Sequence, residues 1–268
     1  MADRAVILAR GLGSRMRRAD SGAVLDAAQA SVAESGVKAL IPIGRPFLDY
    51  VLSALADVGV TRICLVIGPE HEAIRAYYGG LASTRIRIAF AVQHEPRGTA
   101  DAVLAAEAWA EDDPFLVINS DNYYPHAALA ALARTGEPAL AAFSRAGLLA
   151  EGQIDRARIA SFAVAELEGD YLRRILEKPD PATLAALGDD LYVSMNCWRF
   201  DGRIFDACRA VPPSPRGELE LPMAVQQAID AGRMRVRAFR VDLPVLDLSN
   251  RGDVAGVAAR LAAVDVAL

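Results

Sequence analysis

Residues 5–15 read AVILARGLGSR, an apolar run that ends in two glycines spaced two positions apart. An apolar run of this length, bounded by glycine, is typical of a buried strand in a parallel sheet. Glycine admits positive φ and lets a ligand approach the backbone closely, so the turn after this strand can present N–H groups to phosphates. The stretch therefore predicts a strand that leads into a phosphate-binding turn.

Strand and helix patterns alternate outward from this stretch. Apolar runs predict further strands at Arg62–Ile67, Ile86–Ala91 and Phe115–Asn119, and helical spacing lies between them at Phe47–Val58, Glu72–Tyr78 and Ala100–Glu111. Such alternation is typical of a doubly wound α/β sheet. Residues 17–37 are polar and rich in alanine and serine, which predicts a mobile loop with a helical piece.

The pattern changes after about residue 140. Strands are predicted there at Arg158–Val164, Tyr171–Leu176, Tyr192–Phe200 and Arg237–Val241, separated by turns that contain proline or glycine. These strands follow one another without the regular helices of the first half. We therefore expect an α/β fold with a mostly parallel, mixed sheet, in one domain that spans residues 1–268.

Composition excludes several classes of protein. The chain has 268 residues, of which 53% are hydrophobic and 24% charged, and its net charge is −5. These values fit a folded globular domain and give no basic surface for nucleic acid or anionic membranes. Three scattered cysteines (Cys64, Cys197 and Cys208) argue against disulfides or a zinc cluster. With no apolar run of about 18 residues and no signal-peptide pattern, we expect a cytoplasmic protein.

Lysine is unusually scarce in this chain. Lysine and arginine together number 29, and only Lys38 and Lys178 are lysine, so the other 27 are arginine. The planar guanidinium group does not replace the compact ammonium group of lysine as a point charge. Both lysines are therefore candidates for functional positions.

Motifs elsewhere in the chain decide between several glycine-turn functions. Met16 stands where a dinucleotide-binding turn has its third glycine, which disfavours a nicotinamide oxidoreductase, and no Gly-Lys-Ser/Thr sequence follows. Instead, polar motifs follow at residues 37–46 (VKALIPIGRP), 93–102 (QHEPRGTADA), 119–122 (NSDN) and 177–179 (EKP), with Asn196 and Asp247 further on.

In order and spacing these motifs resemble those of the sugar-1-phosphate nucleotidyltransferases, over roughly residues 5–254. The resemblance implies a Rossmann-like fold, with a nucleotide-binding half near residues 1–135 and a sugar-phosphate-binding half near 136–268. It also implies transfer of a nucleoside monophosphate from a nucleoside triphosphate to a sugar 1-phosphate, with Mg²⁺ as cofactor and release of pyrophosphate. Because the chain ends soon after Asp247, we expect the short form of the family, without a C-terminal β-helix.

The resemblance assigns a role to each matching residue. The nucleotide would lie against Leu8, Ala9, Gly11, Gly13 and Ser14, with Gln93, Gly98 and Thr99 along the base. The catalytic residues would be Arg15, Lys38, Asp121 and Lys178, the sugar phosphate would contact Glu177, Lys178 and Asn196, and magnesium would be bound by Asp121 and Asp247. A glutamine beside the base favours UTP or dTTP, although relatives that use GTP or ATP have similar stretches.

The reaction requires such groups on chemical grounds as well. Two polyanions must be held together, so cations and a metal have to offset their repulsion, and an ionised phosphate nucleophile needs no general base. Simpler readings exist: Asp121 and Asp247 could cap helices, and Glu177 with Lys178 could be a surface ion pair. Arg10 departs from the family, in which this position is usually small, and so crowds the turn or adds a contact.

Two other functions stay open at this point. One is a non-catalytic relative that senses a nucleotide or a sugar, and the other is a metal-dependent glycosyltransferase that uses a nucleotide-sugar donor. The second class usually carries Asp-x-Asp after a strand, where this chain has Asp121-Asn122-Tyr123. The expected partners are the two small-molecule substrates, without nucleic acid or membrane, and a homo-oligomer is compatible with the sequence.

Overall fold

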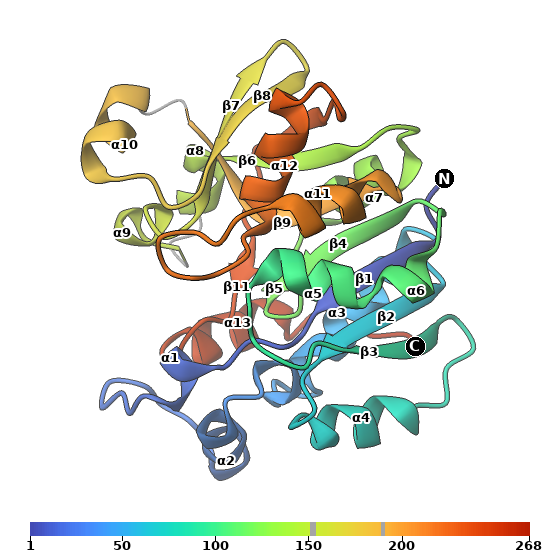
Figure 1. Cartoon of the computed structure of the whole chain (residues 1–268). Coiled ribbons are helices and arrows are strands. Elements are labelled where there is room, and N and C mark those ends of the chain that lie inside the picture. The colour runs from blue at the N-terminus through green and yellow to red at the C-terminus, as the bar shows by residue number, and fades with distance from the viewer. Residues whose placement is uncertain (151–153, 189–190) are drawn as a thin grey trace.

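The computed structural model describes residues 1–150, 154–188 and 191–268. A nine-stranded sheet runs through the molecule in the order β3-β2-β1-β4-β9-β6-β10-β8-β7 (Figure 1). Its strands are β1 (Arg4–Leu8), β2 (Arg62–Ile67), β3 (Arg87–Val92), β4 (Phe115–Asn119), β6 (Ala139–Ser144), β7 (Ala163–Glu168), β8 (Tyr171–Leu176), β9 (Tyr192–Phe200) and β10 (Arg237–Val241). A separate two-stranded sheet joins β5 (Asn122–Tyr123) to β11 (Leu246–Asp247).

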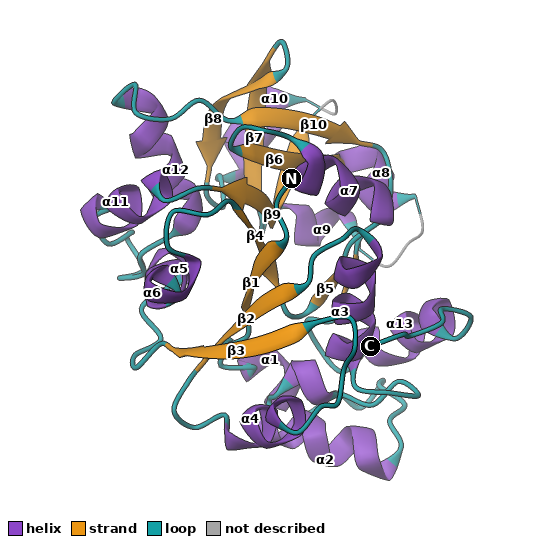
Figure 2. Ribbon diagram, turned by 90° about the vertical axis from the view of Figure 1, so that its right-hand side faces the viewer, coloured by secondary structure: helices purple, strands orange, loops and turns teal. Residues whose placement is uncertain are grey.

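Helices cover both faces of the large sheet (Figure 2). They are α1 (Ser14–Arg17), α2 (Ala27–Ser35), the 3-10 helix η1 (Lys38–Leu40), α3 (Phe47–Asp57), α4 (Glu72–Gly79), α5 (Thr99–Ala105), α6 (Glu107–Ala110), α7 (His126–Arg134), α8 (Arg145–Leu149), α9 (Arg156–Ile159), α10 (Pro181–Leu187), α11 (Arg203–Ala210), α12 (Leu221–Asp230) and α13 (Asp253–Leu261). No described helix is long and apolar enough to cross a membrane.

The first half of the sheet is wholly parallel, as its sequence predicts. Strand β1 pairs in parallel with β2 and β4, and β2 pairs in parallel with β3. Ala5 and Ile7 of β1 lie in the core under α3, whereas Val6 lies in the core under α5 and α12. Since successive residues of a strand point to opposite faces, β1 is buried on both sides, which confirms the doubly wound fold.

The second half makes the sheet mixed. Strand β9 runs antiparallel to β4, β6 and β7, and β7 forms an antiparallel pair with β8. Strands β6 and β10 pair in parallel. Because β9 crosses next to β4, residues near position 196 come to lie beside residues near position 120.

Two predicted elements differ from the structure, and the strand β6 was not predicted. The strand predicted at Arg158–Val164 is wrong in its first part, because Asp155 caps the helix α9 there by accepting a hydrogen bond from Arg158 N at 2.8 Å. The helix predicted over Ala100–Glu111 is interrupted at Ala106, between α5 and α6. Strand β6 had no counterpart among the predicted strands.

The helical piece expected within residues 17–37 is α2. It begins at Asp26, which accepts from Gln29 N, while the Gln29 side chain accepts from Asp26 N. This reciprocal pair is a capping box, and it fixes where the helix starts. The helix ends at Gly36, in the left-handed region with φ 77°.

Candidate active site

The glycine turn after β1 is held by a close backbone contact. Gly13 has φ 62°, and a Cβ atom at this position would lie 2.1 Å from Gly36 O, so only glycine fits. Gly36 O also accepts a hydrogen bond from Lys38 N at 3.0 Å. The end of α2 therefore fixes both the glycine turn and the start of η1, which carries Lys38.

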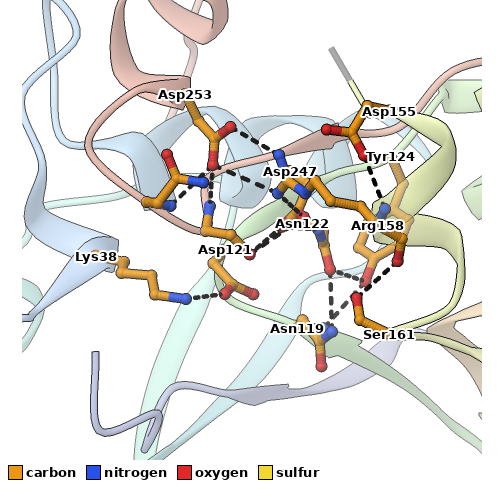
Figure 3. Close-up of polar contacts among 12 residues, drawn as sticks. Lys38, Asn119, Asp121, Asn122, Tyr124, Asp155, Arg158, Ser161, Asp247 and Asp253 are labelled. Atoms are coloured by element: carbon orange, nitrogen blue, oxygen red, sulfur yellow. Dashed lines mark hydrogen bonds and ion pairs between the residues drawn. The ribbon is translucent and has the colours of Figure 1, made fainter. Parts of the chain in front are cut away.

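Lys38 and Asp121 form an ion pair although 83 residues separate them. Lys38 Nζ lies 2.6 Å from Asp121 Oδ2, and the two side chains are 18% and 23% exposed (Figure 3). Asp121 follows β4 and leads into the short strand β5, so it does not cap a helix. The pair joins two of the residues predicted to be catalytic.

Asp247 lies next to Asp121 because β11 pairs with β5. Asp247 is the register partner of Asn122, and Leu248 N donates to Asp121 O at 2.8 Å. The Asn122 amide donates to Asp247 Oδ1 at 3.1 Å, and Ser249 Oγ donates to the same carboxylate at 3.2 Å. The two aspartates predicted to bind metal are therefore brought together by strand pairing.

The surroundings of Asp247 disfavour the ionised form of its carboxyl group. Burial, and then the negative charge of Asp121, raise its pKa from 3.8 to about 6. A cation that binds between two nearby carboxylates offsets the repulsion between them. Among the described residues no group of three or more His, Cys, Asp or Glu side chains has metal-site geometry. Two carboxylates nevertheless fit Mg²⁺, which keeps waters and takes substrate phosphate oxygens as further ligands.

Arg158 is a site residue that the sequence did not reveal. Its guanidinium group contacts Asp247 Oδ2, and its Nη1 donates to Asp253 Oδ1 at 2.7 Å (Figure 3). Asp253 itself accepts from Ser249 N and Asn250 N, both at 2.8 Å, so Asp253 rather than Asp247 organises the start of α13. The one feature of the local sequence that indicates a helical turn at Arg158 is Asp155, a capping residue three positions before it.

Two cavities meet beside these groups at the carboxyl ends of the parallel strands. One measures about 400 Å³ and the other about 330 Å³. The first is lined by Leu8, Ala9, Gly11, Lys38, Gln93, Gly98, Thr99, Asp121 and Asn196. The second is lined by Gly11, Gly13, Ser14, Arg15, Lys38, Thr99, Asp121, Glu177, Lys178, Asn196 and Asp247. Every predicted site residue thus lines at least one cavity, and Lys38 and Asp121 line both.

Gln93 sits in the wall of the larger cavity with a fixed amide orientation. Its Nε2 donates to Gly98 O at 3.0 Å and to Asp101 Oδ2 at 2.8 Å, and the residue is only 4% exposed. Both partners are acceptors, so the amide nitrogen must face them, and Oε1 is the acceptor end of the amide. Gln93 is therefore a buried, oriented acceptor and not a solvated strand end.

Acidic and basic groups alternate in the wall of the smaller cavity and directly behind it. Glu177 Oε1 lies 3.8 Å from Lys178 Nζ and 3.3 Å from Arg216 Nη2, and Arg216 also pairs with Glu220. Burial, followed by the negative charge of Glu220, raises the pKa of Glu177 from 4.5 to about 7. Glu177 is thus poised to change its protonation state near neutral pH.

Two residues of this cavity hold strained backbone conformations. Lys178 has φ 43° and Asn196 has φ 52°. Both values lie in the left-handed region, which residues other than glycine rarely adopt. Strain of this kind persists only where surrounding contacts enforce it, and it is concentrated at functional sites. Both positions were predicted from sequence to contact the sugar phosphate.

Comparison with known proteins identifies the family. The family model described as Nucleotidyl transferase matches residues 31–243, most of the chain. The chain belongs to the nucleotidyl transferase family. The resemblance inferred from the motifs is thereby confirmed.

Two curated relatives illustrate how far the similarity extends. The UTP–glucose-1-phosphate uridylyltransferase AglF of Haloferax volcanii is 28% identical over 247 residues, which cover 91% of this chain and 90% of AglF. A glucose-1-phosphate thymidylyltransferase of Streptomyces antibioticus is 30% identical over 241 residues, which cover 85% of this chain and 58% of the relative. The chain thus spans little more than half of the second protein.

A solved structure shares the fold. UDP-glucose pyrophosphorylase complexed with UDP-glucose superimposes with a TM-score of 0.75 at 16% identity, covering 98% of this chain and 99% of the other. This similarity confirms the predicted Rossmann-like α/β fold.

Proposed function

We propose that this protein transfers a nucleoside monophosphate from UTP or dTTP to a sugar 1-phosphate, with Mg²⁺ bound and pyrophosphate released. The observation that carries the proposal is the convergence of Lys38, Asp121 and Asp247 at the junction of two cavities. The two curated relatives act, by their names, on glucose 1-phosphate with a uridylyl or a thymidylyl group.

The two halves of the chain divide the work in this proposal. Residues 1–135 supply the glycine turn, Lys38 and Asp121, and hold the base in the larger cavity and the triphosphate where the two cavities meet. Residues 136–268 supply Lys178, Asn196 and Asp247, and hold the sugar phosphate in the smaller cavity. The sugar phosphate oxygen then attacks the α-phosphorus in line, while pyrophosphate leaves on the opposite side.

The cations of the chain offset the repulsion between the two anionic substrates. Lys38 would hold phosphate oxygens beside Asp121, Arg15 would reach the triphosphate, and Lys178 would bind the sugar phosphate. Asp121 and Asp247 would hold the magnesium ion. When bound, Mg²⁺ supplies charge neutralisation and orientation of the phosphate oxygens.

The orientation of Gln93 supports a uracil or thymine base. Gln93 lines the cavity, and its Oε1 is left as the acceptor of the amide because its amide nitrogen is bound to Gly98 and Asp101. Uracil and thymine carry a donating N3–H, whereas adenine and cytosine present a ring nitrogen that only accepts. An acceptor that meets the ring nitrogen at this edge therefore favours UTP or dTTP over ATP or CTP, whose donors at the same edge are exocyclic amino groups.

The proposal is tested by measuring pyrophosphate release from each nucleoside triphosphate with a panel of sugar 1-phosphates and Mg²⁺. We expect release with UTP or dTTP, and a loss of at least about 100-fold in kcat for Asp121→Asn with an unchanged Tm. Asp206→Asn is the matched control, because Asp206 is 80% exposed on α11.

Other results would overturn the proposal. Nucleotide binding without pyrophosphate from any combination would support a non-catalytic relative. Transfer of sugar from a nucleotide sugar would support a glycosyltransferase. Near-normal turnover of Asp121→Asn would remove this carboxylate from the metal site.

A further inference from the structure

Arg10 is a buried cation at the edge of the larger cavity, at a position where the family usually has a small residue. Its side chain is 6% exposed. From the end of β1 it reaches Glu70 Oε1 at 3.4 Å and His94 O at 3.1 Å, and it contributes to the cavity wall. The guanidinium group therefore crosses the carboxyl ends of β2 and β3, where a ligand in this cavity would lie.

Two donors of this guanidinium group are unused within the protein. Nε and Nη1 of Arg10 are buried and have no hydrogen-bond partner in the described part of the chain. Buried charged donors are normally paired, so an exception calls for an explanation such as a ligand. Within the described part of the chain Arg10 uses only Nη2, so two nitrogen atoms of its guanidinium group are left without an acceptor.

The neighbouring groups define what that acceptor is. His94 O, which accepts from Arg10, belongs to the residue after Gln93, so the guanidinium group lies beside the strand end that carries the Gln93 acceptor. His71 also lines the cavity; its Nδ1 accepts from Gly68 N and burial lowers its pKa, so it is neutral with its proton on Nε2. The wall of this cavity thus includes Arg10 and His71, which can donate, and Gln93, which can accept.

We infer that Arg10 reads the base by donating to a carbonyl oxygen that flanks the N–H group bound by Gln93. Uracil and thymine match this arrangement because carbonyl groups flank N3–H on both sides. The inference rests on the proposed function and adds a specificity residue to it. Arginine is suited to this role since its planar fork holds donors in a fixed plane.

A contact with the triphosphate and a purely structural role are the competing explanations for Arg10. A phosphate contact would be used equally by every triphosphate, including inorganic tripolyphosphate, which has no base. A structural role, as an anchor for Glu70 at the start of α4, would lower Tm without changing selectivity. Of the three roles, only recognition of the base depends on the carbonyl oxygens of uracil or thymine.

The test measures dissociation constants by calorimetry, with Mg²⁺ and without sugar phosphate, for UTP, 2-thio-UTP, 4-thio-UTP and tripolyphosphate. Sulfur accepts hydrogen bonds poorly, so we expect the wild type to bind one thio analogue more weakly than UTP. In Arg10→Met, which keeps the apolar stem, we expect at least about a tenfold loss for UTP, no loss for tripolyphosphate, and no remaining difference between UTP and that analogue. Arg10→Lys provides a second variant that retains the charge and should recover part of the discrimination.

Arg75→Ala is the matched control, because Arg75 lies on α4 with a side chain that is 39% exposed and paired with Glu72. An equal loss for UTP and tripolyphosphate in Arg10→Met, or undiminished discrimination against the thio analogue, would overturn the role of Arg10 and leave the proposed function intact. Failure of the wild-type protein to bind any nucleotide would overturn both.

Discussion

Glu177 shows how burial turns a single carboxyl group into a pH-sensitive one. The side chain is 16% exposed and lies among Arg216, Glu218 and Glu220. Its pKa in the folded protein is about 7, against an ordinary value of 4.5. Between these two pH values the folded state binds more protons than the unfolded state, so the stability of the protein falls as pH rises through this window.

We expect Glu177→Gln to be more stable than the wild type at pH 8, by on the order of 2 kcal/mol, because the amide carries no buried charge. The gain in stability should shrink as pH falls towards 4.5, where position 177 is neutral in the folded wild type as well as in the folded variant. Arg216 keeps Glu220 as its partner in the variant. Urea unfolding at pH 5, 6, 7 and 8 measures the difference in stability between the variant and the wild type. Glu72→Gln is the control, because the Glu72 side chain is 78% exposed. A stability difference that does not vary with pH would contradict this assignment.

At the residue scale, the sequence predicted the site residues that belong to motifs. It missed those that reach the site only because the fold brings distant segments together. Asp121 and Lys38 stand in recognisable stretches, and both line the two cavities. Arg158 stands in no motif, and its contacts with Asp247 and Asp253 arise from chain segments about 90 residues away. No local pattern encodes such an encounter.

At the scale of elements, Gly98 joins two loops of the candidate site. It has φ 117°, and a Cβ atom there would lie 2.5 Å from the backbone oxygen of Leu219. Leu219 also donates to Arg97 O at 2.7 Å and accepts from Ala100 N at 2.8 Å. The loop before α5 and the loop before α12 are therefore locked together at this glycine, which also accepts from Gln93.

We expect Gly98→Ala to lose about 2–4 kcal/mol of stability, because the Cβ atom meets backbone that cannot move aside cheaply. The affinity for the nucleotide should fall as well, since the bond that orients Gln93 is displaced. Gly59→Ala is the matched control: Gly59 has φ 91°, but a Cβ there has no neighbour within 4 Å in the described part of the chain. It should lose only about 1–2 kcal/mol and keep its nucleotide affinity. Equal losses in urea unfolding would show that backbone conformation, and not loop packing, decides the effect.

Elements with a strong apolar pattern were predictable, and elements set by their caps were not. The predicted bounds of β2, β4, β8, β9 and β10 agree with the structure. The segment at Arg158 was mistaken for a strand because its apolar residues fit either period, and the capping hydrogen bond of Asp155 decided for a helical turn. Strand β6 was missed because Ala139–Ser144 is rich in alanine, which has little strand preference.

At the scale of the whole molecule, the order of the motifs predicted where those on the parallel strands meet. The carboxyl ends of parallel strands share one edge of the sheet, so the glycine turn, Gln93 and Asp121 had to lie together. The position of Asp247 beside Asp121 was harder to predict, since it depends on the two-residue pairing of β11 with β5. The antiparallel passage of β9, which brings Asn196 to the same edge, also required the complete topology.

The contacts of Arg158 tie distant segments around the paired carboxylates. Its partners Asp247 and Asp253 have side chains that are 4% and 8% exposed, so Arg158→Met leaves both buried carboxylates without this cation. We expect a loss of about 3–5 kcal/mol, the usual result of breaking a buried ion pair by removing one partner. We also expect a larger gain in stability on adding Mg²⁺ than in the wild type, because a cation bound to the folded state replaces part of the missing charge.

The design separates a general loss of packing from a loss of charge balance. Urea unfolding with and without Mg²⁺ is compared for the wild type, Arg158→Met and the control Arg203→Met. Arg203 pairs with Asp201 at 2.7 Å but is 56% exposed, so its replacement should change stability by less than about 1 kcal/mol and leave the Mg²⁺ effect as in the wild type. If Mg²⁺ stabilises Arg158→Met no more than the wild type, then Arg158 and the metal do not share the charge of Asp247. The arginine would then act only by joining α9 to α13 through its contact with Asp253.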